Sequence, residues 1–243
     1  MTPAVVAEAG SPRLPWPQRD WRVRIPTKTT RVPGSTVLIN ANKLSMVRGS
    51  LYGLRRRIIE AFSREGLPLI LAGSNWARPA RELPRENARA LAYAIVNHEL
   101  VDLTEWAGAL PLGGSVDYVG IVDDKEALMA QAEFAVVVEN SATYISEKLF
   151  DAVIAGCVPL YVGPALSSLG IPDGVAVQLG AHARATDFTN AVRTLTQSQK
   201  TAVLDSGRDW LADDSTYTTW AMPYALERLA EAIHQNIVKE TAR

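Results

Sequence analysis

Several residues able to bind a polar ligand gather in one short stretch, ENSATYISEKL, which begins at Glu139. The stretch lies between two apolar runs, FAVVV (134–138) and VPLYVG (158–163). It combines two carboxylates, an amide, a phenol and a lysine, at Glu139, Glu147, Asn140, Tyr144 and Lys148. Because these groups donate and accept hydrogen bonds and carry charge, the stretch predicts a site for a polar ligand such as a phosphate.

Lys148 occupies an unusual place, near the start of a helix predicted over Tyr144–Ala155. The amino end of a helix carries partial positive charge, so a lysine there is unfavourable unless an anion lies beside it. Glu147 obeys the dipole rule, and Ser146 or Thr143 is a suitable N-cap. Free backbone N–H groups at such a helix start also suit phosphate. A solvated lysine and a capping glutamate would explain each residue alone, but the combination favours a ligand site.

A second group of cations lies upstream, on a helix predicted over 51–65 and in the loop before it. The members are Lys43, Arg48, Arg55, Arg56 and Arg57. The phosphate-binding patterns GxGxxG and GxxxxGK[ST] are both absent from the sequence, so side-chain cations would have to bind a phosphate. Three consecutive arginines on a helix point in three directions, so at most two can face one cleft. Arg55 lies nearest the apolar edge of this helix and is the preferred one.

The elements that position these residues alternate along the chain. Apolar runs predict strands at 37–41, 67–73, 134–138, 158–163 and 175–180, with a shorter one in DYVGIV. Helical patterns fall at 51–65, 83–99, 125–132 and 144–155, and over most of 186–239. Continuous apolar strands alternating with helices predict an α/β fold, a Rossmann-like parallel sheet with helices on both faces. Ligands of such sheets bind at the carboxyl ends of the strands, where ENSATYISEKL begins.

Composition excludes several classes of protein. The chain has 243 residues, of which 47% are hydrophobic and 21% charged, and its net charge of −1 predicts no nucleic-acid binding. The single cysteine, Cys157, and three scattered histidines do not form a metal-site pattern. Neither a secretory signal nor an apolar run of transmembrane length occurs in the sequence, which predicts a cytoplasmic protein.

Residues 1–34 differ from the rest of the chain. They are rich in proline, which predicts an extended segment, yet they contain Trp16 and Trp21. Tryptophans are unusual in a disordered arm, so we expect them to pack on this fold or on another domain.

The stretch ENSATYISEKLFDAVIAGCVPLYVGP resembles the signature of the α-1,3-fucosyltransferases, glycosyltransferase family 10. The matching segments are V-E-N-S (138–141), Y-I-S-E-K-L (144–149) and V-P-L-Y-V-G (158–163). Weaker similarity includes the arginine-led helix at 42–62, AGSNW at 72–76 and DDKEAL before FAVVV. The resemblance covers about residues 36–190 and implies the donor-binding half of a GT-B glycosyltransferase. The chain would then divide into a segment 1–34, either extended or a remnant of an acceptor domain, and a nucleotide-sugar-binding domain 35–243.

The resemblance implies a transferase that binds GDP-fucose and transfers fucose with inversion to a glycan hydroxyl. It assigns Glu147 to the ribose hydroxyls and Lys148 to a phosphate, with Asn140 and Tyr144 lining the same pocket. Arg55 would contact the diphosphate, with Arg56 as the alternative. Lys43 and Glu139 are supporting residues, Glu139 holding the donor or the loop. The resemblance implies no obligatory metal and no other cofactor, because side-chain cations can stabilise the departing diphosphate.

The sequence departs from the family at two points. Val138 replaces a phenylalanine, and the 34 residues before the predicted domain are too few for the acceptor domain, which carries the catalytic base. The catalytic residue is therefore unassigned, and we expect the base to come from a partner, from a neighbouring copy of the chain that supplies the missing acceptor domain, or from an unrecognised carboxylate. Two alternatives remain: a non-catalytic nucleotide-sugar-binding domain, and a GT-B transferase that uses another nucleotide sugar.

Overall fold

The computed structural model describes residues 18, 20–22, 31–42, 51–77, 110, 112–143, 145–180, 182–224, 226–227, 230–231 and 234. These residues form a six-stranded sheet of order β3-β2-β1-β4-β5-β6, in which every neighbouring pair is parallel. The strands are β1 (Val32–Ile39), β2 (Leu69–Ala72), β3 (Val116–Gly120), β4 (Ala132–Val138), β5 (Val158–Val162) and β6 (Val177–Gln178). The predicted Rossmann-like parallel sheet is confirmed.

Helices follow most of the strands. They are α1 (Tyr52–Glu65), α4 (Lys125–Met129), α5 (Lys148–Ile154), α6 (Ala185–Thr194), α7 (Gln197–Ala212) and α8 (Asp214–Trp220). The described residues after Ala221 are also helical, whereas the helix predicted over 83–99 lies outside the described residues.

Two strands differ from expectation. β1 begins earlier, at Val32, where its register with β4 shifts and Gly34 takes a positive φ of 74°. β6 is only two residues long because a 3₁₀ turn occupies Asp173–Val175.

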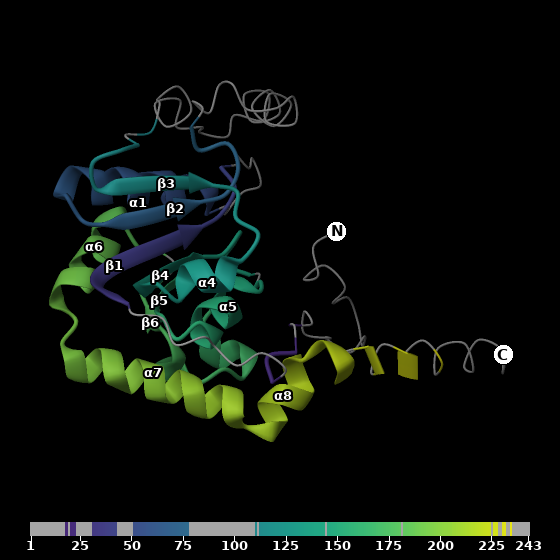
Figure 1. The fold of residues 1–243 in the computed structure, drawn as a ribbon. Helices are drawn as coiled ribbons and strands as arrows, with labels where there is room; N and C mark the ends of the chain where they lie inside the picture. The colour runs from purple at the N-terminus through teal and green to yellow at the C-terminus, as the bar shows by residue number, and fades with distance from the viewer. Residues whose placement is uncertain are drawn as a thin grey trace.

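The central strands of the sheet are buried on both faces. On one face α1 and α6 pack against alternate residues of the central strands, including Leu38, Phe134 and Val136. On the other face α5 and α7 cover the intervening residues, including Val37, Ala135 and Val137. Figure 1 shows α7 running beneath the sheet and leading into α8. Burial on both faces explains why these strands are continuously apolar rather than alternating.

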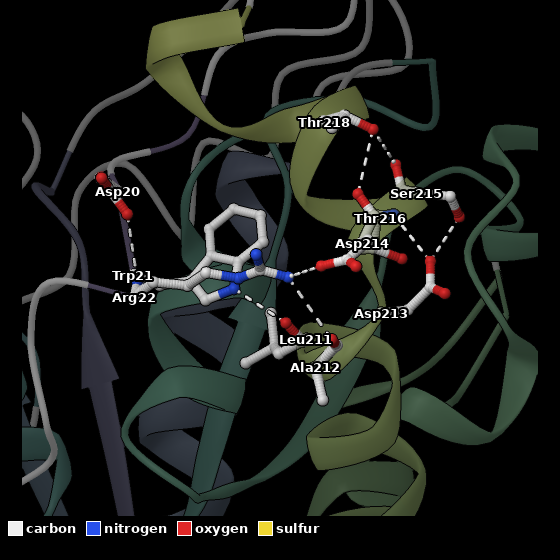
Figure 2. A network of polar contacts seen from close by, with 10 residues as sticks. All are labelled: Asp20, Trp21, Arg22, Leu211, Ala212, Asp213, Asp214, Ser215, Thr216 and Thr218. Carbon is white, nitrogen blue, oxygen red and sulfur yellow. Dashed lines mark hydrogen bonds and ion pairs between the residues drawn. The ribbon is translucent and has the colours of Figure 1, made fainter.

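The N-terminal residues that the structure describes dock on the junction of α7 and α8 (Figure 2). Trp21 is buried against Phe150 and Tyr217, and its indole Nε1 donates to the Leu211 carbonyl at 3.0 Å. Arg22 forms an ion pair with Asp214 at 2.6 Å and stacks over the Tyr217 ring. The expectation that Trp21 packs on the fold is confirmed, while Trp16 lies outside the described residues.

None of the helices that the structure describes is both long enough and apolar enough to cross a membrane.

Candidate functional site

The candidate site lies where the sheet reverses its direction of growth. From β1 the chain proceeds outward to β2 and β3, then returns to place β4 on the other side of β1 and continues to β5 and β6. The carboxyl ends of β1 and β4 therefore form the switch point of the sheet, the place where open α/β sheets bind their ligands. β4 ends at Val138, so Glu139 and Asn140 lie directly at this switch point.

Glu139 and Asn140 point to opposite faces of the sheet, because successive side chains alternate at the end of a strand. The Glu139 carboxylate turns toward the segment before α5, where it accepts hydrogen bonds from the Ser146 backbone N–H at 3.1 Å and from the Ser146 hydroxyl at 2.7 Å. The Asn140 side chain turns toward α1, and its Oδ1 accepts from the Arg55 guanidinium at 2.9 Å. The end of β4 thus connects the helices of both layers.

Lys148 is held on the Glu139 side. Its Nζ donates to the Ser146 hydroxyl at 2.7 Å and lies 3.6 Å from Glu139 Oε2. The anion that a lysine at a helix start requires is therefore present in the chain itself, as Glu139. The Lys148 side chain retains 15% exposure, whereas that of Glu139 is fully buried, so the lysine is the member of this pair that can reach a ligand.

The helix after the loop is shorter than predicted. α5 has seven residues and begins at Lys148, not at Tyr144, and its N-cap is the exposed Glu147, which makes no capping hydrogen bond. The prediction of Ser146 or Thr143 as the N-cap is wrong. The Ser146 hydroxyl does accept from the Lys148 backbone N–H at 3.4 Å and donates to Glu139, but the N-cap position itself falls one residue later, and the Thr143 hydroxyl contacts Ser141. A helix this short does not provide a phosphate site by its terminus alone.

The three consecutive arginines of α1 separate as predicted. Arg57 is exposed, whereas Arg55 and Arg56 are almost fully buried, at 2% and 1% exposure. Arg55 donates to the Val138 carbonyl at 2.7 Å as well as to Asn140, and its guanidinium lies 4.5 Å from the Tyr52 ring centroid. Arg56 donates to Asn42 Oδ1 at 3.2 Å, on the β1 side of the switch point.

Burial shifts the pKa of each charged group at the site. Desolvation lowers the pKa of Lys148 and that of Arg55, while the Glu139 charge opposes both shifts. Arg55 lowers the pKa of Lys148 further, because the two cations repel each other. Desolvation raises the pKa of the Glu139 carboxyl although Lys148 and Ser146 favour its ionised form. The two largely buried cations therefore repel each other, although Glu139 attracts both, and an anion bound near them would relieve the repulsion.

The structure brings together Arg55, Glu139, Asn140 and Lys148, with Glu147 close enough to interact electrostatically with Lys148. Arg56 lies apart, on Asn42. The predicted residues Lys43 and Tyr144 lie outside the described residues. Among the residues that the structure does describe, no three His, Cys, Asp or Glu side chains gather to hold a metal ion.

Two features of the site were not predicted. Ser146, considered only as a helix cap, joins Glu139 to Lys148. Gly163, at the end of β5, leaves room for the site, since a Cβ there would lie 2.8 Å from Glu139 Cγ and too close to the Tyr161 hydroxyl. The glycine was visible in V-P-L-Y-V-G, but its role depends on β5 lying beside β4.

Comparisons with known proteins show similarity of fold. Anabaena HepE, solved with UDP and with UDP-glucose, aligns with a TM-score of 0.51 and 15% identity over 83% of this chain and 48% of that chain. TarM aligns with a TM-score of 0.50 and 12% identity over 86% of this chain and 37% of that chain. An α1,3-fucosyltransferase with GDP aligns with a TM-score of only 0.42 and 13% identity, over 83% of this chain and 47% of that chain, which is too weak to support an argument.

No family model matches the chain, and no curated protein matches it. The chain spans about half the length of the HepE structures to which it is similar. At these identities the similarity concerns the fold alone. The chain has the Rossmann-like α/β architecture found in one half of glycosyltransferases of GT-B type.

Proposed function

We propose that this chain binds the diphosphate of a nucleotide sugar at the switch point of its sheet and serves a glycosyltransferase. The observation that carries the proposal is the charge balance at the carboxyl end of β4. Lys148 lies 3.6 Å from the buried Glu139 carboxylate, and Arg55, on the other face of the sheet, interacts electrostatically with both of them. A diphosphate is an anion of suitable chemistry for such a site, since fixed cations stabilise the charge that develops on it as the sugar leaves.

Two different nucleotide-sugar donors are each supported by a separate observation. The V-E-N-S and Y-I-S-E-K-L segments favour GDP-fucose and an inverting transfer to a glycan hydroxyl. The similarity of fold to HepE, solved with UDP and UDP-glucose, favours a UDP-sugar. In either case we assign Lys148 and Arg55 to the diphosphate, Glu147 to the ribose, and Asn140 and Tyr144 to the pocket wall. Lys43 and Arg56 are proposed as supporting cations. We propose that no metal is needed, so chelation with EDTA should leave nucleotide affinity unchanged.

We assign no catalytic base. An inverting transfer needs a group that removes the proton of the acceptor hydroxyl. Glu139 is a poor candidate, because its carboxylate is fully buried and both of its oxygens already accept hydrogen bonds. The base would come from a partner, from a neighbouring copy of the chain or from an unassigned carboxylate.

The test is a titration of GDP, UDP, GDP-fucose and UDP-glucose, followed by thermal unfolding. A ligand at 100 times its dissociation constant should stabilise the fold by about 2.7 kcal/mol. Lys148→Met should abolish most of this stabilisation. Lys200→Met is the matched control, because Lys200 is also about one-sixth exposed and also pairs with a β4 carboxylate, Glu133, at the opposite end of the strand.

The outcomes separate the readings of the site. Stabilisation by GDP alone favours the fucosyltransferase-like reading, and stabilisation by UDP alone favours the other donor. Slow release of GDP from GDP-fucose, or of UDP from UDP-glucose, would identify an enzyme, whereas binding without release would identify a binding module. No stabilisation by any of the four ligands would refute the proposal.

A further inference from the structure

Glu139 and Lys148 are joined by a hydrogen-bonded chain whose direction is fixed by chemistry. A carboxylate can only accept hydrogen bonds and an ammonium group can only donate them. The Ser146 hydroxyl must therefore donate its single hydrogen to Glu139 Oε2 and accept from Lys148 Nζ, both at 2.7 Å. The second carboxylate oxygen, Oε1, accepts from the Ser146 backbone N–H at 3.1 Å.

This arrangement leaves Lys148 free to bind and Glu139 unable to. An ammonium group has three N–H donors. Among the residues that the structure describes, the Ser146 hydroxyl accepts one of them and Glu139 Oε2 lies farther away, at 3.6 Å, so Lys148 has donors to offer a ligand. Glu139, by contrast, is enclosed by its neighbours, and a Cβ on Gly163 would already lie 2.8 Å from its Cγ.

We propose that Glu139 is a positioning residue that acts through Ser146 to hold the Lys148 ammonium group toward the diphosphate, and that Glu139 itself does not touch the ligand. This inference rests on the proposed function and identifies two further residues of the same site. The proposal gives different roles to the two glutamates of ENSATYISEKL. Glu147 is exposed and can contact a ligand, whereas the buried Glu139 holds the Lys148 ammonium group in place.

The electrostatics at Lys148 agree with this role. Burial and the Arg55 charge both lower the pKa of Lys148, whereas Glu139 and, more weakly, Glu147 raise it. On the far side of Glu139 lies Tyr161, whose pKa is raised by burial and by the Glu139 charge, so the phenol stays neutral. Glu139 is thus the largest influence that keeps Lys148 protonated and able to attract an anion.

The test uses Glu139→Gln, which preserves shape but removes the charge, and Ser146→Ala, which removes the connecting hydroxyl. Glu133→Gln is the matched control, because it removes a glutamate–lysine pair at the opposite end of the same strand. The affinities of GDP, UDP, pyrophosphate, guanosine and uridine are measured by calorimetry between pH 6 and pH 10. We expect Glu139→Gln and Ser146→Ala each to weaken diphosphate binding about tenfold, the equivalent of one charge-assisted hydrogen bond, and to leave nucleoside binding unchanged.

The pH profile distinguishes positioning from a merely structural effect. Diphosphate binding needs protonated Lys148, so affinity should fall as pH rises through the lysine pKa, which already lies below its usual value. In Glu139→Gln this alkaline fall should begin at lower pH, because the charge that raises the lysine pKa is gone. Ser146→Ala should shift it less, since the Glu139 charge remains. Equal loss of diphosphate and nucleoside affinity, with an unshifted profile, would overturn the proposal.

A measurement without ligand keeps this inference separate from the proposed function. The pH dependence of Lys148 acetylation, followed by mass spectrometry, reports the lysine pKa in the free protein. It should move to lower pH in Glu139→Gln and stay in place in Glu133→Gln.

If no nucleotide binds but the acetylation profile moves, the proposed function fails and the contact between Glu139 and Lys148 stands. If nucleotides bind and neither profile moves, the positioning role fails while the function stands. Should Glu139→Gln not fold, unchanged diphosphate affinity in Ser146→Ala is the result that overturns the role.

Discussion

The Arg55→Met variant tests whether the buried Arg55 holds helix α1 to the carboxyl end of strand β4. Arg55 donates to the Val138 carbonyl at 2.7 Å and to Asn140 Oδ1 at 2.9 Å, and it is 2% exposed. In Arg55→Met both acceptors lose a charged donor, and each such bond contributes about 1.5–3 kcal/mol. Removing the guanidinium also removes the unfavourable free energy of burying a charge, which offsets part of this loss. The offset applies particularly here because, among the described residues, Arg55 Nε has no hydrogen-bond partner. We therefore expect Arg55→Met to lower the free energy of unfolding by about 2 kcal/mol.

The chain provides a matched control two residues away. Arg57 is on the same helix but exposed, so Arg57→Met should change the free energy of unfolding by less than about 0.5 kcal/mol. Urea denaturation followed by circular dichroism measures both variants, and calorimetry with GDP or UDP then measures ligand affinity. Loss of one of the two site cations should weaken diphosphate binding about tenfold in Arg55→Met only. Equal stability and equal affinity in the two variants would refute the structural role of Arg55.

Other predictions concern the parts of the fold that support the site. Trp21→Ala should destabilise the protein by about 3–5 kcal/mol in denaturant unfolding, because a buried indole is lost, whereas Tyr224→Ala, at the exposed edge of the same aromatic group, should cost much less. A cost below about 1 kcal/mol for Trp21→Ala would mean that the N-terminal residues are not part of the fold. Gly163→Ala should cost about 1–3 kcal/mol, since the new Cβ meets the Tyr161 hydroxyl, and an unchanged melting temperature would contradict that packing. Burial raises the pKa of Cys157 to about 12, so thiol reagents at pH 8 should label it only at the rate of unfolding; rapid labelling of the native protein would show that the thiol is accessible.

The same cysteine gives a pH dependence of stability. A thiol whose pKa is raised by folding, from 9.0 to about 12, binds its proton more tightly in the folded state. The unfolded chain then loses that proton first as pH rises above 9, so stability should fall by about 1.4 kcal/mol for each pH unit between those two values. Cys157→Ala should remove this contribution and leave that of other groups whose pKa is raised by burial, such as Tyr161. An alkaline loss of stability that is the same in both proteins would contradict the prediction.

Much of the fold could be predicted from the sequence because it depends on local patterns. Short, continuous apolar runs rich in β-branched residues, such as FAVVV and VPLYVG, favour strands buried on both faces, and their alternation with helices favours a parallel sheet. Boundaries were less predictable. α5 begins at Lys148 rather than Tyr144, and the residues before it are held instead by the contact of Ser146 with the buried Glu139, which the helical pattern does not reveal.

The candidate site likewise combines features that the sequence predicts with features that depend on the tertiary structure. The sequence by itself identified the polar residues after β4 and the arginines of α1, since their types and their place after a buried strand are local facts. Only the tertiary structure decided which residues face one another. Parallel pairing of β1 with β4 brings α1 beside the end of β4, and the alternation of Glu139 and Asn140 then directs one cation, Lys148, to one face and the other, Arg55, to the opposite face. The physical reason is that burial and charge pairing depend on tertiary neighbours, and these determine that Glu139 is enclosed while Lys148 remains partly exposed.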